Sequence, residues 1–168
     1  MEGILRPWRK EDAADLAAAL NNRKVLDNLR DGLPYPYTPA DAAAYIAAME
    51  AADPENTWAC AITAEGRAVG SISVSRQGNI HFRTGELGYY VAEPWWGRGL
   101  ATQAVKALCG RLFRETDLLR IFAVPFAENA ASCRVLEKAG FACEGVLRKN
   151  AVKNGVVRDM RLYALVQA

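Results

Sequence analysis

The sequence has 168 residues, of which 51% are hydrophobic and 24% charged, and its formal net charge is +2. This length and composition predict one globular domain over residues 1–168, with a sizeable core. The charges are scattered, which argues against a nucleic-acid-binding surface. No apolar run approaches the roughly 20 residues of a membrane-spanning helix. Because the N-terminus also lacks the features of a signal peptide, we expect a cytoplasmic protein that does not bind a membrane.

The cysteines and the single histidine indicate neither a disulfide framework nor a metal site. The four cysteines are far apart and form no CxxC pair, and His81 is the only histidine. Dispersed cysteines of this kind are typical of reduced core thiols in the cytosol. One histidine with scattered cysteines is a poor zinc ligand set, so no metal is expected.

The first third of the chain predicts a short strand followed by two helices. The strand covers residues 3–6, and the first helix covers residues 12–22. Prolines in segment 31–38 predict a stiff loop. Thr38 is a typical N-cap and Pro39 a typical first residue for the second helix, which Asp53-Pro54 should end.

Three strands of a meander are expected next. Alternation of apolar and small residues predicts strands near 58–62, over 68–75 and over about 80–91. Glu65-Gly66 and residues 76–79 supply the two turns.

The meander leads into the most informative stretch, from Glu86 to Thr102. Pro94 should end the strand, Gly97 and Gly99 follow, and an apolar pattern then predicts a helix over about 99–115. Such an order of strand, glycine turn and helix directs backbone N–H groups at an anion. A dinucleotide fingerprint would need a third glycine at position 102, and a Walker loop would need Gly-Lys-Ser/Thr, so neither fits.

The last third predicts a strand, a helix and a hairpin. The strand covers residues 119–124, and the helix covers residues 129–139 and is closed by Gly140. Two further strands, 141–149 and 156–166, flank the turn Asn154-Gly155. The whole order, β-αα-βββ-α-β-α-ββ, describes a mixed α/β domain.

Two motifs give the sequence a resemblance to the GNAT acetyltransferases, in the branch of the RimJ and RimL ribosomal-protein N-terminal acetyltransferases. Trp96-Gly-Arg-Gly-Leu-Ala101 is similar to the family's pyrophosphate loop. Residues 129–141, which end in Glu-Lys-Ala-Gly-Phe, are similar to its asparagine-containing helix. The resemblance covers nearly the whole chain and implies a mostly antiparallel central sheet with splayed middle strands.

The resemblance implies acetyl-CoA as the cofactor. Its pyrophosphate would lie on the backbone N–H groups after the glycine turn, and its pantetheine arm beside the edge of the splayed strand. The residues implied in this binding are Val91, Trp96, Gly97, Arg98, Gly99, Leu100, Ala101, Thr102 and Asn129. Trp96 departs from the commoner Gln or Arg of the family. Because the loop binds through its backbone, we expect binding to survive that difference.

Two residues are candidates for catalysis. Glu86 matches a frequent family glutamate on the central strand and is the candidate base. Its side chain should point to the face of the strand opposite that of Leu87. The alternative is a structural ion pair with Arg83 or another cation. Leu136 occupies the position where many members carry a tyrosine that acts as general acid, and the resemblance assigns the role of general acid to Ser132 instead. The alternative for Ser132 is a hydrogen bond to the helix backbone.

The expected activity is acetyl transfer from acetyl-CoA to a primary amine. Without an acidic cluster for a polyamine, a protein N-terminal α-amine is favoured slightly over spermidine, and a small amine, amino acid or antibiotic stays open. A non-catalytic acetyl-CoA sensor is the alternative from another class. A homodimer is frequent in the family. The candidate acceptor-binding side chains are Tyr35, Tyr37, Phe82 and Tyr89.

Overall fold

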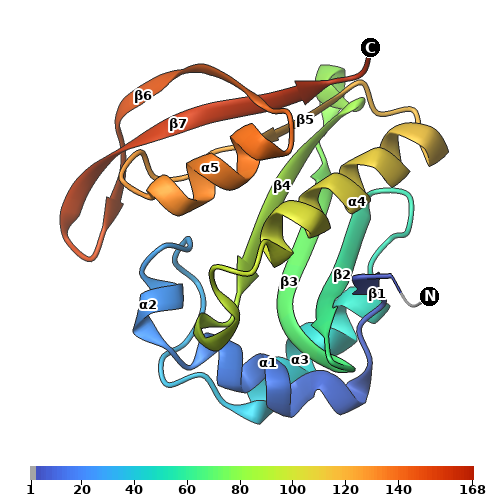
Figure 1. Cartoon of the computed structure of the whole chain (residues 1–168), viewed down its shortest axis with the longest axis vertical. Helices are drawn as coiled ribbons and strands as arrows, with labels where there is room; N and C mark the ends of the chain where they lie inside the picture. The colour runs from blue at the N-terminus through green and yellow to red at the C-terminus, as the bar shows by residue number, and fades with distance from the viewer. Residues whose placement is uncertain (1–2) are drawn as a thin grey trace.

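The computed structural model describes residues 3–168, which form one seven-stranded sheet in the order β1-β2-β3-β4-β5-β7-β6 (Figure 1). All neighbouring strands are antiparallel except β4 and β5, which are parallel. The strands are β1 (Leu5–Arg6), β2 (Thr57–Ala64), β3 (Arg67–Arg76), β4 (Thr84–Val91), β5 (Arg120–Ala123), β6 (Ala142–Lys153) and β7 (Val156–Val166). The helices are α1 (Ala13–Leu20), α2 (Arg23–Leu26), α3 (Pro39–Glu50), α4 (Leu100–Glu115) and α5 (Ala130–Lys138).

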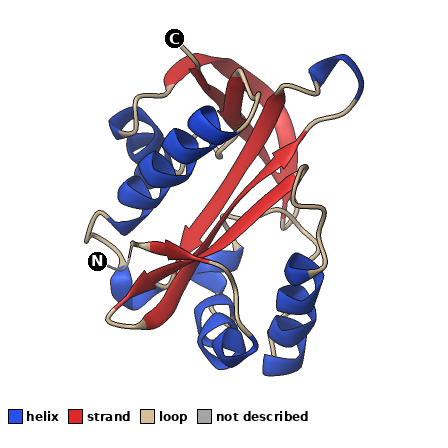
Figure 2. Ribbon diagram, turned by 90° about the vertical axis from the view of Figure 1, so that its right-hand side faces the viewer, coloured by secondary structure: helices blue, strands red, loops and turns tan. Residues whose placement is uncertain are grey.

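Helices cover both faces of the sheet (Figure 2), and each face has its own apolar core. On one face, α4 and α5 pack their apolar sides on the strands, with Leu108 and Leu136 fully buried. On the other face, α1, α2 and α3 pack around Leu16 and Ile46. The sheet is therefore the shared middle layer, and any site on its central strand opens toward one of two helix groups.

The middle of the sheet opens where β4 and β5 part. Their parallel pairing covers only residues 84–86 on β4 and residues 120–122 on β5. Beyond Glu86, β4 runs on for five more residues to Val91 with β3 on one side only. Figure 1 shows β5, β6 and β7 diverging from β4 at this end.

The structure confirms the predicted α/β order, the mostly antiparallel sheet and its splayed middle strands. The predicted helix start at residue 39 is confirmed by a reciprocal cap, in which Thr38 accepts from Asp41 N–H and Asp41 accepts from Thr38 N–H. The predicted turns Glu65-Gly66 and Asn154-Gly155 are both present, and their glycines have φ of 75°. That left-handed conformation suits glycine.

The main differences from the sequence prediction are two strand boundaries and one short helix. Residues 80–83 are not strand, because a 3-10 turn at Asn79–His81 interrupts the meander and leaves Ile80 81% exposed, with no core to face. The short helix α2 was not predicted. β6 continues to Lys153 through a register shift in which Lys149 adopts φ 53°.

Within residues 3–168, no helix is both long enough and apolar enough to span a membrane. The same residues contain no cluster of three or more His, Cys, Asp or Glu side chains that could hold a metal ion. Cys60, Cys109 and Cys133 are buried as free thiols, and Cys143 is an exposed one.

A buried ion pair joins β1 to the start of α1. The guanidinium of Arg6 donates to both carboxylate oxygens of Asp12 at 2.7 and 2.8 Å, and Arg9 N–H donates at 2.9 Å. Asp12 is only 5% exposed. Burial alone would raise the pKa of Asp12, but the hydrogen bonds from Arg6 and Arg9 outweigh it and lower that pKa below its usual value.

We expect Asp12→Asn to lower the free energy of unfolding by about 3 kcal/mol at neutral pH, because Arg6 loses a buried counter-charge. Since folding lowers the pKa of Asp12, its contribution is present above the unfolded pKa of ~3.9 and is lost as pH falls through the folded value. The difference between wild type and variant should therefore shrink below about pH 4. Urea denaturation across pH measures it.

Asp15→Asn is the matched control. Asp15 also accepts from an arginine, but Arg67 is 64% exposed, so we expect a much smaller loss of stability. Equal losses in the two variants would contradict the special role of the buried pair.

Candidate active site

The free edge of β4 presents backbone groups to the opening left by β5. Gln77 N–H donates to the Thr84 carbonyl and Ala92 N–H donates to the Val69 carbonyl, so even-numbered residues of this strand bond to β3. In an antiparallel ladder the alternate residues point the other way. Tyr89 and Val91 therefore direct their N–H and C=O groups into the opening, where a ligand with amide groups can pair with them.

The indole of Trp96 already occupies one of these backbone groups. Its Nε1–H donates to the Val91 carbonyl oxygen at 2.7 Å, although the side chain is 48% exposed. An unpaired backbone carbonyl at a strand edge costs free energy unless it finds a donor. Trp96 thus caps the last outward carbonyl of β4 and ties the loop before α4 to the strand.

The N-terminus of α4 has the features of an anion site. Gly97 and Gly99 both have φ of 75°, and a Cβ at Gly97 would meet nothing within 4 Å. Gly99 is the N-cap, no side chain caps the helix, and its first turn has no acidic residue. The N–H groups of this first turn, including those of Leu100, Ala101 and Thr102, lack acceptors within the helix. Together with the helix dipole they suit a pyrophosphate.

The predicted binding residue Arg98 lies beside this turn. Its guanidinium stacks 4.6 Å from the centre of the Trp95 ring and donates weakly to the Pro94 carbonyl at 3.4 Å. Arg98 adds positive charge close to the helix N-terminus. This placement is compatible with an anion on the backbone N–H groups.

On the face of β4 that carries α4 and α5, Tyr89 and Ser132 form a hydroxyl pair. Tyr89 Oη lies 2.7 Å from Ser132 Oγ and also donates to the Ser132 carbonyl at 3.1 Å. Burial raises the pKa of Tyr89 to about 12, so the phenol stays protonated at neutral pH. Asn129 begins α5, and its Oδ1 accepts from Ser132 N–H at 3.2 Å. This cap leaves the amide NH₂ of Asn129 available to a ligand.

The opposite face of β4 carries Glu86, as the strand parity predicted. Arg30, from the loop after α2, donates to its two carboxylate oxygens at 3.3 and 2.6 Å. Glu86 therefore has the cationic partner of the structural alternative, although the partner is Arg30 and not Arg83. Gly88 follows on the same face; it is exposed, and a Cβ there would meet nothing within 4 Å.

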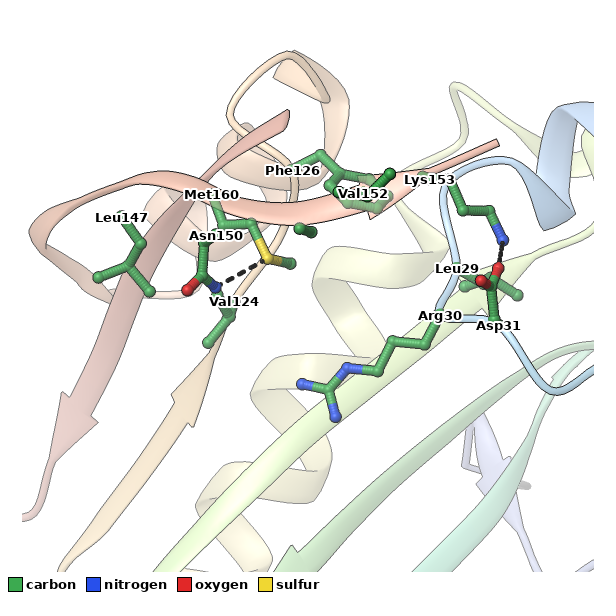
Figure 3. Close-up of a pocket in the computed structure, with 11 residues that line it drawn as sticks. Leu29, Arg30, Asp31, Val124, Phe126, Leu147, Asn150, Val152, Lys153 and Met160 are labelled. Carbon is green, nitrogen blue, oxygen red and sulfur yellow. Dashed lines mark hydrogen bonds and ion pairs between the residues drawn. The ribbon is translucent and has the colours of Figure 1, made fainter. Parts of the chain in front are cut away.

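A cavity of about 370 Å³ lies next to Arg30, between the loop after α2 and the β6–β7 hairpin (Figure 3). Figure 3 shows Arg30 reaching from its loop toward β4 and the Lys153–Asp31 ion pair at one end. The lining residues are Leu29, Arg30, Asp31, Val124, Phe126, Leu147, Asn150, Ala151, Val152, Lys153 and Met160. Because Val124 and Phe126 directly follow β5, the cavity opens beside the splay.

The structure separates the four predicted acceptor-binding side chains. Tyr37 is 4% exposed in the core of α1–α3, and Phe82 lies before the paired end of β4, away from the splay. Tyr89 points to α5, on the face opposite Glu86, and Tyr35 is half-exposed beneath Arg23. Among the described residues none of the four lines the cavity. Their part in acceptor binding stays a prediction.

The residues that do line the cavity were missed by the sequence analysis. Arg30 has no local signal, because its partner Glu86 lies 56 positions away. The hairpin did carry a signal, since Ala142–Val166 contains five basic and two acidic residues.

Comparison with known proteins finds one matching family and several curated relatives. Residues 4–142 match the acetyltransferase (GNAT) domain family. The "Probable N-acetyltransferase YjcK" of Bacillus subtilis is 34% identical over 68% of the chain and 63% of that protein. The ribosomal-protein-serine acetyltransferase of Escherichia coli is 30% identical over 61% of the chain and 56% of that protein. The match thus spans less than two thirds of either curated relative.

A solved structure has the same fold over nearly the whole chain. Mycobacterium smegmatis RimJ in complex with CoA-disulfide superposes with a TM-score of 0.85 at 26% identity, covering 96% of this chain and 80% of that one.

Trp96→Phe tests the indole hydrogen bond to Val91. The ring remains but its donor is lost, so we expect the free energy of unfolding to fall by about 1 kcal/mol. Denaturant titration measures the change. An unchanged stability together with an unchanged exchange rate of neighbouring backbone amides would show that the hydrogen bond holds nothing in place.

Proposed function

We propose that this chain, which belongs to the GNAT acetyltransferase family, transfers the acetyl group of acetyl-CoA to a primary amine. The observation that carries the proposal is the geometry of the splay, where an open strand edge lies beside an uncapped helix N-terminus. The names of the curated relatives and the CoA complex of M. smegmatis RimJ support it. We further propose that residues 1–168 act as one catalytic domain.

Acetyl-CoA fits the residues that surround the splay. The N–H groups at the start of α4 would hold the pyrophosphate, with Gly97 and Gly99 allowing its close approach. The outward N–H and C=O of Tyr89 and the N–H of Val91 would pair with the pantetheine amides, and Asn129 would donate from its amide. Trp96 binds the Val91 carbonyl, so it sets where this pairing ends.

When bound, the cofactor supplies an activated acetyl thioester. The chain supplies a proton acceptor on one face of β4 and a hydrogen-bond donor on the other. Glu86 accepts a proton from the acceptor amine, directly or through water, so that a neutral nitrogen attacks. The nitrogen would bond to the acetyl carbon as the carbon–sulfur bond breaks. Of the two protons that the ammonium group gives up, one would go to Glu86 and the other to the leaving thiolate. Ser132 Oγ donates a hydrogen bond toward the sulfur, with the protonated Tyr89 behind it.

A protein N-terminal α-amine is the acceptor we favour, in line with the name of the E. coli relative. A small-molecule amine is the second candidate, favoured by a cavity of only about 370 Å³. A cytoplasmic location, a homodimer and the absence of nucleic-acid binding stay predictions. A sensor that binds acetyl-CoA without turnover would be indifferent to changes at Glu86 and Ser132.

Gly99→Asp should weaken acetyl-CoA binding about tenfold or more relative to Gly99→Asn, a difference of ~1.4 kcal/mol. Both side chains have the same shape and tolerate the left-handed backbone, but only Asp places a negative charge at the helix N-terminus. Calorimetric titration with acetyl-CoA measures the two affinities. Equal affinities of the two variants for acetyl-CoA would contradict the proposal that the pyrophosphate binds at the N-terminus of α4.

Glu86→Gln should lower kcat/KM for a productive amine by about 10²–10⁴-fold, the range of general acid–base catalysis. Ser132→Ala should lower it by about 10–100-fold, because one hydrogen bond to developing charge is lost. Thiol release from acetyl-CoA measures both rates.

Glu144→Gln is the matched control, because Arg120 also binds Glu144 through both carboxylate oxygens, at 3.0 and 2.7 Å, but outside the splay. It should keep wild-type activity. The exposed pair of Glu86 and Arg30 should contribute under about 1 kcal/mol to stability, so unfolding measurements separate lost catalysis from lost structure. Full activity of Glu86→Gln would return Glu86 to a structural role.

A further inference from the structure

The charges around the cavity are already matched in pairs. Arg30 binds Glu86 with its closest contact at 2.6 Å, and Lys153 binds Asp31 at 2.8 Å. Asp31 is the single carboxylate among the lining residues, and Glu86 is reached only through Arg30. A third cationic group, the guanidinium of Arg158, stacks 4.8 Å from the centre of the Phe126 ring. An acceptor with several positive charges would meet these cations and no unpaired carboxylate.

The remaining wall of the cavity is apolar. Side chains of Leu, Val, Phe, Ala and Met make up seven of the eleven lining residues, and the Asn150 amide donates to the Met160 sulfur, a weak acceptor. The volume of about 370 Å³ lies at the lower end of the range of about 300–1,000 Å³ for small-ligand sites. The cavity thus has the size of a small-ligand site, and its wall suits an apolar group better than a large polar antibiotic.

We propose that the acceptor is a zwitterion, an amine with an apolar side chain and a carboxylate a few bonds away. The inference rests on the proposed acetyl transfer and names the class of acceptor for it. On binding, the ammonium group takes Glu86 and the carboxylate takes Arg30, so each charge of the existing ion pair exchanges one partner for another of the same sign. A dication would leave Arg30 facing a positive charge instead.

This exchange makes Arg30 a specificity-determining residue. Its guanidinium is planar and binds a carboxylate through two N–H groups, which suits an acceptor carboxylate as well as it suits Glu86. The Arg30 side chain is 70% exposed on a loop, so it can turn from one carboxylate to the other without disturbing the core.

Two sources supply this chemistry, a free apolar amino acid and a peptide N-terminus with an acidic second residue. The test measures kcat/KM for L-leucine, leucinamide, spermidine and the amidated tripeptides Leu-Asp-Ala and Leu-Lys-Ala. We expect at least a tenfold preference for leucine over leucinamide, for Leu-Asp-Ala over Leu-Lys-Ala, or for both. Whichever carboxylate-bearing member is faster identifies the source.

Variants of Arg30 test whether this residue binds the carboxylate of the acceptor. In Arg30→Gln the preference should fall to near one, and Arg30→Lys should restore part of it. Arg148→Gln, which removes an exposed charge of the same hairpin outside the cavity lining, should leave the preference unchanged. The ratio of two acceptors is the readout, because any change at Glu86 that follows from losing Arg30 affects both acceptors alike.

The outcomes separate the two proposals. Turnover of leucinamide or spermidine at a rate equal to or above that of leucine and Leu-Asp-Ala overturns the zwitterionic class and leaves acetyl transfer standing. A preference for the carboxylate that survives in Arg30→Gln also overturns the role of Arg30. No turnover of any amine by a protein that binds acetyl-CoA overturns acetyl transfer itself.

Discussion

The parallel pairing of β4 with β5 ends after three residue pairs, and the rest of the candidate site depends on this early end. A strand edge inside a sheet must find partners for its backbone groups. Here one outward carbonyl takes the indole of Trp96, while the others remain directed into the opening. The same opening places the uncapped start of α4 and the start of α5 on one side of β4. A longer β5 would pair this edge and close the site.

Because side chains alternate along β4, the strand carries a charged pair on one face and a pair of hydroxyl groups on the other. Glu86 and Arg30 lie on the face toward α1–α3, whereas Tyr89 and Ser132 lie on the face toward α5. A carboxylate and a protonated phenol therefore flank one strand, each with its own partner. A ligand in the splay can reach both faces of β4, because no neighbouring strand covers the edge between the two faces there.

Local signals in the sequence were sufficient for most of the fold. The cap at Thr38 and the glycine turn before α4 depend on residues a few positions apart, and the structure contains both. The ion pair of Arg30 with Glu86 joins residues 56 positions apart, and no periodicity encodes such a contact. Tyr37 illustrates the same limit, because a proline-flanked aromatic is read as a loop residue until the core that buries it is known.

Gly88 sets how much room there is beside the Glu86 carboxylate. It lies two residues after Glu86 on the same face of β4, and the space where its side chain would be is empty. Its backbone is ordinary strand, so a larger residue there would not strain the fold. A methyl or hydroxymethyl group at this position would instead take up volume beside the carboxylate of Glu86, the proposed base. The room beside Glu86 is therefore adjustable by one substitution that puts no strain on the backbone of β4.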